Sequence, residues 1–339
     1  MTEKQRLLGK FVLSTACCLL SLAILSCRLT GFPEGDFFPI DPGDLSFVRQ
    51  SNVPAMSSVT NMTLYNNFAF VADGNGRLGI HDVTSSLTPI TISSITIPDV
   101  QQSIRRIEVD WRNNLYVAAG VGGLHVINAS NTHFPVVVAS HNQINAADLS
   151  LYEDYIAVID NNGWRLLEVV SSSHLSELFF YDYFIPRQPM RILMRGNWVF
   201  VASRDFIDIF DITNPFNVRL ERQIRISGFV DFDILDNRFL VVATFNRLLF
   251  IDITSPLNAD IASDLVPMWT PHVIRAHNNY LFISWTNRSL SAYRILTITS
   301  LREESRKEFP QLVRDIDFRG NLIFLSNGIN GFDIYSYVR

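Results

Sequence analysis

Few residues of this chain have the types and spacing that enzymatic or metal chemistry requires. The seven histidines are scattered, none forms an H-E-x-x-H motif, and no two share a familiar metal-ligand spacing with a carboxylate. Residues 74–79 (GNGRLG) satisfy G-x-G-x-x-G, but a dinucleotide-binding loop of that pattern must open a helix. Here the segment joins two apolar strands, so we interpret it as a hairpin turn. We therefore expect no metal, no nucleotide and no other cofactor.

Cys27 is the residue with the most specific chemistry. Residues 1–10 are basic, residues 11–25 (FVLSTACCLLSLAIL) are apolar and uncharged, and Cys27 follows one residue later. A run of 15 residues is short for a membrane span, which needs about 20, but it suits a secretory signal. The segment ILSC (24–27) resembles the lipobox of bacterial lipoproteins, in the looser form of spirochaetal lipoproteins. The resemblance implies acylation of Cys27, for example with palmitate; a plain signal peptide or an uncleaved anchor is the alternative.

The sequence predicts three parts: a signal peptide (1–26), an acylated cysteine with a tether (27–44) and a folded body (45–339). The chain is 47% hydrophobic and 18% charged, which excludes intrinsic disorder. The signal carries a net charge of +2 and the whole chain −5, so the remainder carries −7. An acidic body argues against a nucleic-acid partner, because phosphate binding needs a concentrated positive surface.

A unit of about 42 residues is repeated seven times in the body. Its most constant part is an apolar strand that ends in a small residue, and this motif begins at positions 70, 116, 157, 200, 241, 282 and 324. Each copy predicts four short antiparallel strands, and the period predicts an all-β fold, a seven-bladed β-propeller. The third strands of the first five copies end at Asp82, Asn128, Glu168, Asp211 and Asp252, which we interpret as turn caps. The seventh copy has only three strands, so we expect residues 45–51 to complete it and close the ring.

The segments FIDIFDITNP (206–215) and LLFIDITSP (248–256) resemble the LVIVD-repeat proteins, bacterial propellers that are exported or lie on the cell surface. The resemblance implies the propeller fold from about residue 45 onward. It implies no catalytic residues, because most members have no established activity and they share no catalytic motif.

The first strands of the blades carry the candidate ligand site, because they line the central channel of a propeller. Ten residues before the repeated motif lie Thr60, Arg106, Ala147, Met190, Asp231, His272 and Arg314. One residue later lie Asn61, Ile107, Asp148, Arg191, Phe232, Val273 and Asp315. Alternation along a strand lets only one of the two sets point inward. The candidates for binding at the channel mouth are Arg106, Asp148, Arg191, Asp231, His272, Arg314 and Asp315; the alternative is a water-filled channel with mutual Arg–Asp pairing.

The function predicted from these features is that of a monomeric, non-enzymatic module, anchored by lipid in the cell envelope, that binds a protein or a glycan on a propeller face. Arg28 stands where inner-membrane lipoproteins of enteric bacteria have aspartate, which favours the outer membrane. Two alternatives stay open. One is a hydrolase or lyase at the channel mouth that uses Asp231, His272, Arg106 and Arg314, and the other is a structural envelope protein with no ligand.

Overall fold

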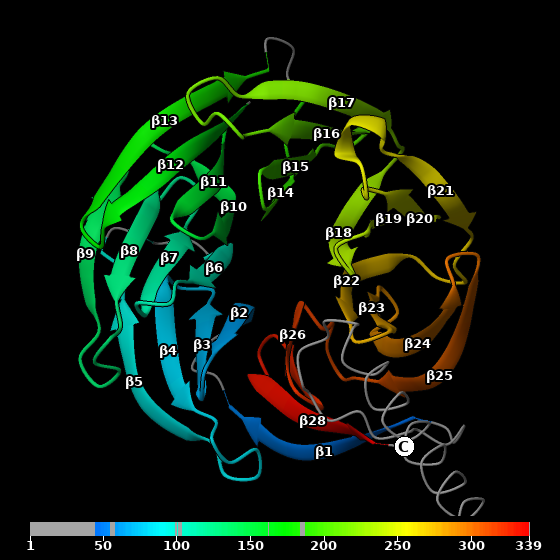
Figure 1. The fold of residues 1–339 in the computed structure, drawn as a ribbon. Helices are drawn as coiled ribbons and strands as arrows, with labels where there is room; N and C mark the ends of the chain where they lie inside the picture. Colours follow the sequence, from blue (N-terminus) through cyan, green and yellow to red (C-terminus); the bar gives the residue numbers. More distant parts are fainter. Residues whose placement is uncertain are drawn as a thin grey trace, which may run out of the picture. The chain divides into compact units, whose positions relative to one another are not determined.

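Seven four-stranded antiparallel sheets surround a central axis in the computed structural model, and each sheet forms one blade (Figure 1). The structure describes residues 45–338 except 55–57, 99, 101–103, 162 and 184–186, and all of these lie in the compact unit Gly43–Arg339. The predicted signal peptide, Cys27 and the predicted tether lie outside the described residues. The prediction of an all-β, seven-bladed propeller is confirmed.

The strands of each blade follow one another outward from the axis (Figure 1). The first strands are β2 (Val59–Tyr65), β6 (Arg106–Val109), β10 (Ala146–Tyr152), β14 (Arg191–Arg195), β18 (Phe229–Leu235), β22 (Pro271–His277) and β26 (Asp315–Arg319). The second strands are β3 (Phe68–Asp73), β7 (Asn114–Ala118), β11 (Tyr155–Asp160), β15 (Trp198–Ala202), β19 (Phe239–Thr244), β23 (Tyr280–Trp285) and β27 (Leu322–Ser326). The third strands are β4 (Arg77–Asp82), β8 (Leu124–Asn128), β12 (Gly163–Ser171), β16 (Phe206–Asp211), β20 (Leu248–Asp252), β24 (Ser289–Thr297) and β28 (Phe332–Val338). The fourth strands are β5 (Ile90–Thr96), β9 (Val136–His141), β13 (His174–Asp182), β17 (Arg219–Arg225), β21 (Asp260–Leu265), β25 (Ser300–Glu308) and β1 (Ser46–Val53).

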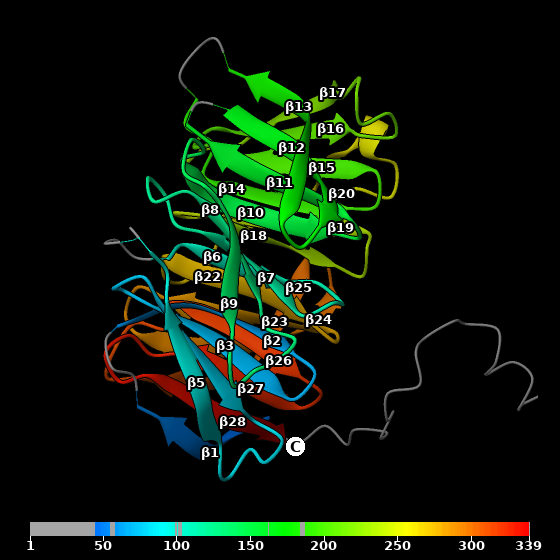
Figure 2. The same cartoon turned by 90° about the vertical axis from the view of Figure 1, so that its left-hand side faces the viewer.

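Packing between neighbouring blades forms the core. The second strands are apolar on both faces because a blade covers each side, and all six residues of β19 are buried. Seven apolar clusters result, one at each junction between neighbouring blades. The outer strands, such as β5 and β9, lie on the side of the ring (Figure 2), and most of their residues are at least partly exposed. In the described part of the chain, no helix is long and apolar enough to cross a bilayer.

The ring is closed by the two ends of the described chain. Strand β1 pairs antiparallel with β28, from Ser46 opposite Val338 to Val53 opposite Phe332. This pairing supplies the fourth strand of the seventh blade, as the sequence predicts, and removes an exposed sheet edge.

Asx-type caps hold several connections between third and fourth strands. The backbone N–H and the hydroxyl of Thr84 donate to Asp82 Oδ1 at 2.8 and 2.6 Å. Thr213 makes the same two bonds to Asp211 Oδ1, at 2.7 and 2.6 Å. The recurrent residue at the end of the third strand is therefore a turn cap in these blades.

The two ends of the ring carry different connections. Leu322 is the first residue after the turn between the first and second strands of the last blade, and it pairs with Ser336 of β28. Two residues further along β28, Val338 pairs with Ser46. The described chain therefore starts at the end that carries the turns between first and second strands and the connections between third and fourth strands. We call this end the basal face. The opposite end, which carries the turns between second and third strands and the links between blades, is the distal face.

Candidate functional site

One layer of side chains occupies equivalent positions on the seven innermost strands. Six of its members lie opposite the last residue of the repeated motif, as Asn61 lies opposite Ala72 and Asp231 opposite Ala243. The seventh, Asp148, lies within an irregularity of β10. This inner layer consists of Asn61, Arg106, Asp148, Arg191, Asp231, Val273 and Asp315.

The alignment of the first strands from the sequence is wrong by one residue in two blades. It assigns Arg106 and Asp231 to a different set from the other members of the inner layer. The reason is turn length. In the second and fifth blades the turn after the first strand has three residues, as between Leu235 and Phe239, whereas Tyr65 and Phe68 enclose only two in the first blade. The extra residue shifts the first strand by one position and brings both charges into the inner layer.

Two arginines of the inner strands each bridge two aspartates. Arg275 Nη1 lies 2.7 Å from Asp231 Oδ2, and its Nη2 lies 2.7 Å from Asp315 Oδ1. Arg191 Nε lies 2.9 Å from Asp231 Oδ1, without hydrogen-bond alignment, and its Nη1 lies 3.5 Å from Asp148 Oδ1. Burial opposes the charge on Asp231, but the two guanidinium groups outweigh it and lower its pKa. The structure therefore brings four of the predicted site residues, Asp148, Arg191, Asp231 and Asp315, into one ionic network through Arg275.

The acceptors of the inner layer also link neighbouring blades at four of the seven junctions. A first strand has no neighbour on its channel side, so its backbone N–H groups need other partners. The contacts are Ile107 N to Asn61 Oδ1 at 2.8 Å, Ile192 N to Asp148 Oδ2 at 2.9 Å, Ile274 N to Asp231 Oδ2 at 3.1 Å and Met62 N to Asp315 Oδ2 at 3.2 Å. The three carboxylates, which also pair with arginine, and the Asn61 amide thus join neighbouring blades.

A second layer lies two residues further along the same strands. Arg106 Nη2 lies 3.0 Å from Glu108 Oε1, and Asp317 Oδ2 accepts from Leu64 N at 2.7 Å. Burial raises the pKa of Glu108, and it raises that of Asp317 to about 7. A cavity of about 330 Å³ opens among this layer and includes Arg106, Glu108, Arg275 and Asp317 in its lining. The sequence analysis missed Glu108, Arg275 and Asp317, although the two-residue alternation of the strands could have found them.

His272 and Arg314 lie one residue before the inner layer and outside its ionic network. Burial lowers the pKa of His272. Among the described side chains, no hydrogen bond or ion pair joins any two of Asp231, His272, Arg106 and Arg314. Asp231 is committed to arginines and Arg106 to its own strand, so the four do not form a directly connected acid–base group. No group of three or more His, Cys, Asp or Glu in the described ranges is placed to hold a metal ion.

Asp317 predicts a specific pH dependence of stability. An unfolded aspartate has a pKa of about 4. With a native pKa of about 7, Asp317 stabilises the fold fully below about pH 4, and this contribution is lost as the pH rises through 7. Asparagine does not titrate. The Tm of Asp317→Asn relative to that of the parent is therefore expected to rise between about pH 5 and pH 8.

Buried histidines act in the opposite direction. Burial lowers the pKa of His81 to about 4, so its contribution is lost as the pH falls. The quantity to follow is therefore the difference in Tm between the variant and the parent at each pH, from thermal unfolding. A difference that is flat or that falls with pH contradicts the prediction.

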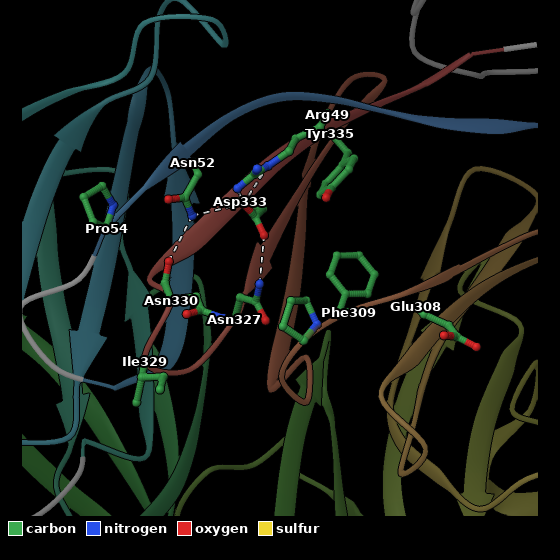
Figure 3. A pocket seen from close by; sticks show the side chains of 11 residues that line it. Arg49, Asn52, Pro54, Glu308, Phe309, Asn327, Ile329, Asn330, Asp333 and Tyr335 are labelled. Carbon is green, nitrogen blue, oxygen red and sulfur yellow. Dashed lines mark hydrogen bonds and ion pairs between the residues drawn. The ribbon is translucent and has the colours of Figure 1, made fainter.

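A second hollow lies at the seam between the last strand and β1 (Figure 3). Its volume is about 520 Å³, and its lining includes Asn327 and Ile329, which lie at the distal face in the turn before β28. The buried Asp333 is its centre. Arg49 Nη2 donates to Asp333 Oδ1 at 2.6 Å, Asn52 Nδ2 to the same oxygen at 3.0 Å, and Asn327 Nδ2 to Oδ2 at 2.9 Å.

One polar atom of this hollow is left without a partner. Asn327 is 3% exposed, and its Oδ1 accepts no hydrogen bond from any described residue. A buried acceptor without a donor costs free energy, so such an atom is usually paired with protein, water or ligand. The Arg49 side chain beside it is 54% exposed. The hollow therefore combines one free acceptor with one accessible cation. Sequence reasoning missed it because its lining comes from both ends of the body.

The protein is therefore a seven-bladed propeller in which polar side chains of the inner layer link neighbouring blades. The LVIVD-repeat family model matches residues 58–96 and 186–223, which correspond to the first and fourth blades. The chain thus carries LVIVD repeats. Of the two segments that suggested this resemblance, 206–215 lies within a matched range and 248–256 lies outside both ranges.

Solved structures with little sequence identity share the fold. The WD40 β-propeller domain of Doa1 superposes with a TM-score of 0.66 at 11% identity, covering 86% of this chain and 97% of that one. The computationally designed Ika8 protein gives a TM-score of 0.64 at 10% identity, covering 86% of this chain and 100% of that one. At such identity the likeness shows the fold alone. A comparison with curated proteins finds no match.

Proposed function

We propose that this protein is an exported, lipid-anchored, non-enzymatic module of the cell envelope that holds a protein or glycan partner on its distal face. The basic segment, the apolar run and Cys27 support export and acylation. Arg28 supports the outer membrane as the location. The repeat architecture supports a binding role, because a rigid propeller presents a wide surface of fixed shape at each end.

The observation that carries the proposal is the accessible cation of the seam hollow, Arg49. The charges of the inner layer pair with one another, with Glu108 and Arg275 and with backbone N–H groups, so they serve the scaffold. At the seam, by contrast, Asn327 Oδ1 is buried and unpaired beside the half-exposed guanidinium of Arg49. An oxygen of the partner would bind the exposed guanidinium of Arg49, and a water held in the hollow would satisfy the buried Asn327 Oδ1. Sugars and peptides both offer such oxygens.

Substitution of Ile329 tests the site with little risk to folding. Ile329 lines the hollow and is 68% exposed, so Ile329→Asp is expected to leave Tm unchanged while it abolishes partner binding. The measurement is binding of the purified acylated protein to an array of envelope glycans, together with crosslinking to envelope proteins on cells. Val121→Asp is the matched control, because Val121 is exposed in the corresponding turn of the second blade, away from the hollow.

Each outcome has a distinct meaning. Loss of binding in Ile329→Asp with retention in Val121→Asp supports the seam hollow as the site. Equal binding by both variants places the partner elsewhere and overturns the seam hollow as its site. Turnover of a glycan by the parent protein would replace the binding function by the hydrolase alternative.

A further inference from the structure

The basal face carries at least one exposed apolar side chain on each of six blades. These side chains lie in or beside the connections between the third and fourth strands, and they are between 51% and 75% exposed. In chain order they are Leu87, Phe134, Val170, Phe216, Leu257 and Leu296. Single exposed apolar residues are ordinary on protein surfaces. All six blades in which a connection joins the third and fourth strands carry such a side chain. The turns themselves do not require it, because polar caps hold several of them.

In the seventh blade, the start of the described chain lies where the other blades have the connection between the third and fourth strands. Its third and fourth strands, β28 and β1, are not joined by a connection, and Ser46 lies at the basal end of their pairing. The chain before it, residues 27–44, has 18 residues and spans at most about 60 Å when fully extended. An anchor at Cys27 therefore holds the basal side of the ring close to the bilayer, at an effective concentration in the millimolar range.

We propose that the basal face rests on the lipid bilayer and inserts its six apolar side chains into the interface. The proposal depends on the acylation of Cys27 proposed above. Trp111, in the first turn of the second blade, is exposed on the same face, and tryptophan favours the membrane interface. Weak contacts of single side chains suffice, because the anchor supplies the local concentration. In this orientation the distal face and the seam hollow point away from the membrane.

The net charge of the chain determines the lipid probe. Because the chain after residue 26 carries −7, anionic lipids repel it and zwitterionic phosphatidylcholine does not. The test uses the full-length acylated protein reconstituted on phosphatidylcholine vesicles and separated by flotation. With brominated phosphatidylcholine, the fluorescence of Trp111 is expected to be quenched. Trp111→Phe should lose most of that quenching, since Trp164 and Trp285 are buried and Trp198 and Trp269 are only partly exposed.

A pair of labelled variants locates the face directly. Phe134→Cys on the basal face and Phe245→Cys on the distal face replace the same residue type at exposed positions. With a polarity-sensitive fluorophore on each cysteine, the label at 134 is expected to shift to the blue and become protected from iodide on vesicles. The label at 245 is expected to behave as it does on protein in detergent.

The outcomes separate the anchor from the docking. Flotation with both labels exposed to iodide overturns docking and leaves the anchor intact. Protection at 245 rather than at 134 also overturns it, because the opposite face would then contact the lipid. Failure of the parent to float, with Cys27→Ser behaving identically, overturns the anchor and the docking with it.

Discussion

Replacement of Asp231 by alanine is expected to lower the free energy of unfolding by about 3–5 kcal/mol. Asp231 is buried and pairs with both Arg191 and Arg275, and it also accepts from Ile274 N. Truncation leaves the two guanidinium groups without their shared partner, so Arg191 keeps only Asp148 and Arg275 keeps only Asp315 to offset their desolvation. It also removes one link between the fifth and sixth blades. Urea unfolding, followed by circular dichroism, measures the change.

The matched control is an exposed ion pair of the same kind. Arg247 Nη1 lies 3.2 Å from Asp264 Oδ2, and both side chains are about half-exposed. Asp264→Ala is therefore expected to cost less than about 1 kcal/mol. If Asp231→Ala costs no more than Asp264→Ala, the channel network does not hold the ring together. Asp231→Asn keeps an acceptor for Ile274 N without the charge, so an intermediate loss is expected.

Phe324→Ala is expected to cost a similar amount, about 3–5 kcal/mol, for a different reason. Phe324 is fully buried in β27, in the cluster that joins the last blade to the first. Val59 and Met62 of the first blade belong to the same cluster, as does Phe332 of β28. The smaller side chain leaves a cavity at the junction where strands from the end of the chain, β27 and β28, pack against the first blade. Besides Tm, we expect faster hydrogen exchange in β1 and β28.

Phe134→Ala serves as the control for this variant because Phe134 is 75% exposed. Its expected effect is within about 0.5 kcal/mol. Phe324→Ala contradicts the prediction if its loss is equally small, or if exchange increases uniformly in all seven blades. A uniform increase would mean that the junction between last and first blades has no special part in stability.

The fold could be predicted from the sequence because each blade repeats the same local solution. An apolar strand that ends in a small residue, a polar turn and a capped connection recur at nearly constant spacing, so seven weak patterns support one another. The closing role of residues 45–51 follows from the missing strand of the seventh copy. These are features in which local sequence and global architecture agree.

The channel was harder to predict because one residue in a turn changes which side chains face it. Arg106 and Asp231 belong to the inner layer only because the turns of the second and fifth blades are longer by one residue. A count of positions from the repeated motif cannot detect this shift. The seam hollow was beyond local reasoning altogether, since Arg49 and Asp333 are distant in the sequence and meet only when the ring closes.

Because arginines and acceptors alternate from blade to blade around the channel, an even and an odd number of blades have different electrostatic consequences. Arg191 and Arg275 reach the network from the fourth and sixth blades, and Arg106 of the second blade pairs with Glu108 of its own strand. The acceptors of the inner layer come from the odd blades, so an odd ring must place two acceptor blades side by side. At that junction, blade one has an amide, and Asn61 Nδ2 donates to Asp315 Oδ2 at 2.6 Å where a second carboxylate would repel it. Gain of a single blade elsewhere would place two like blades together. By electrostatics, the ring can grow by one blade only between its last and first blades.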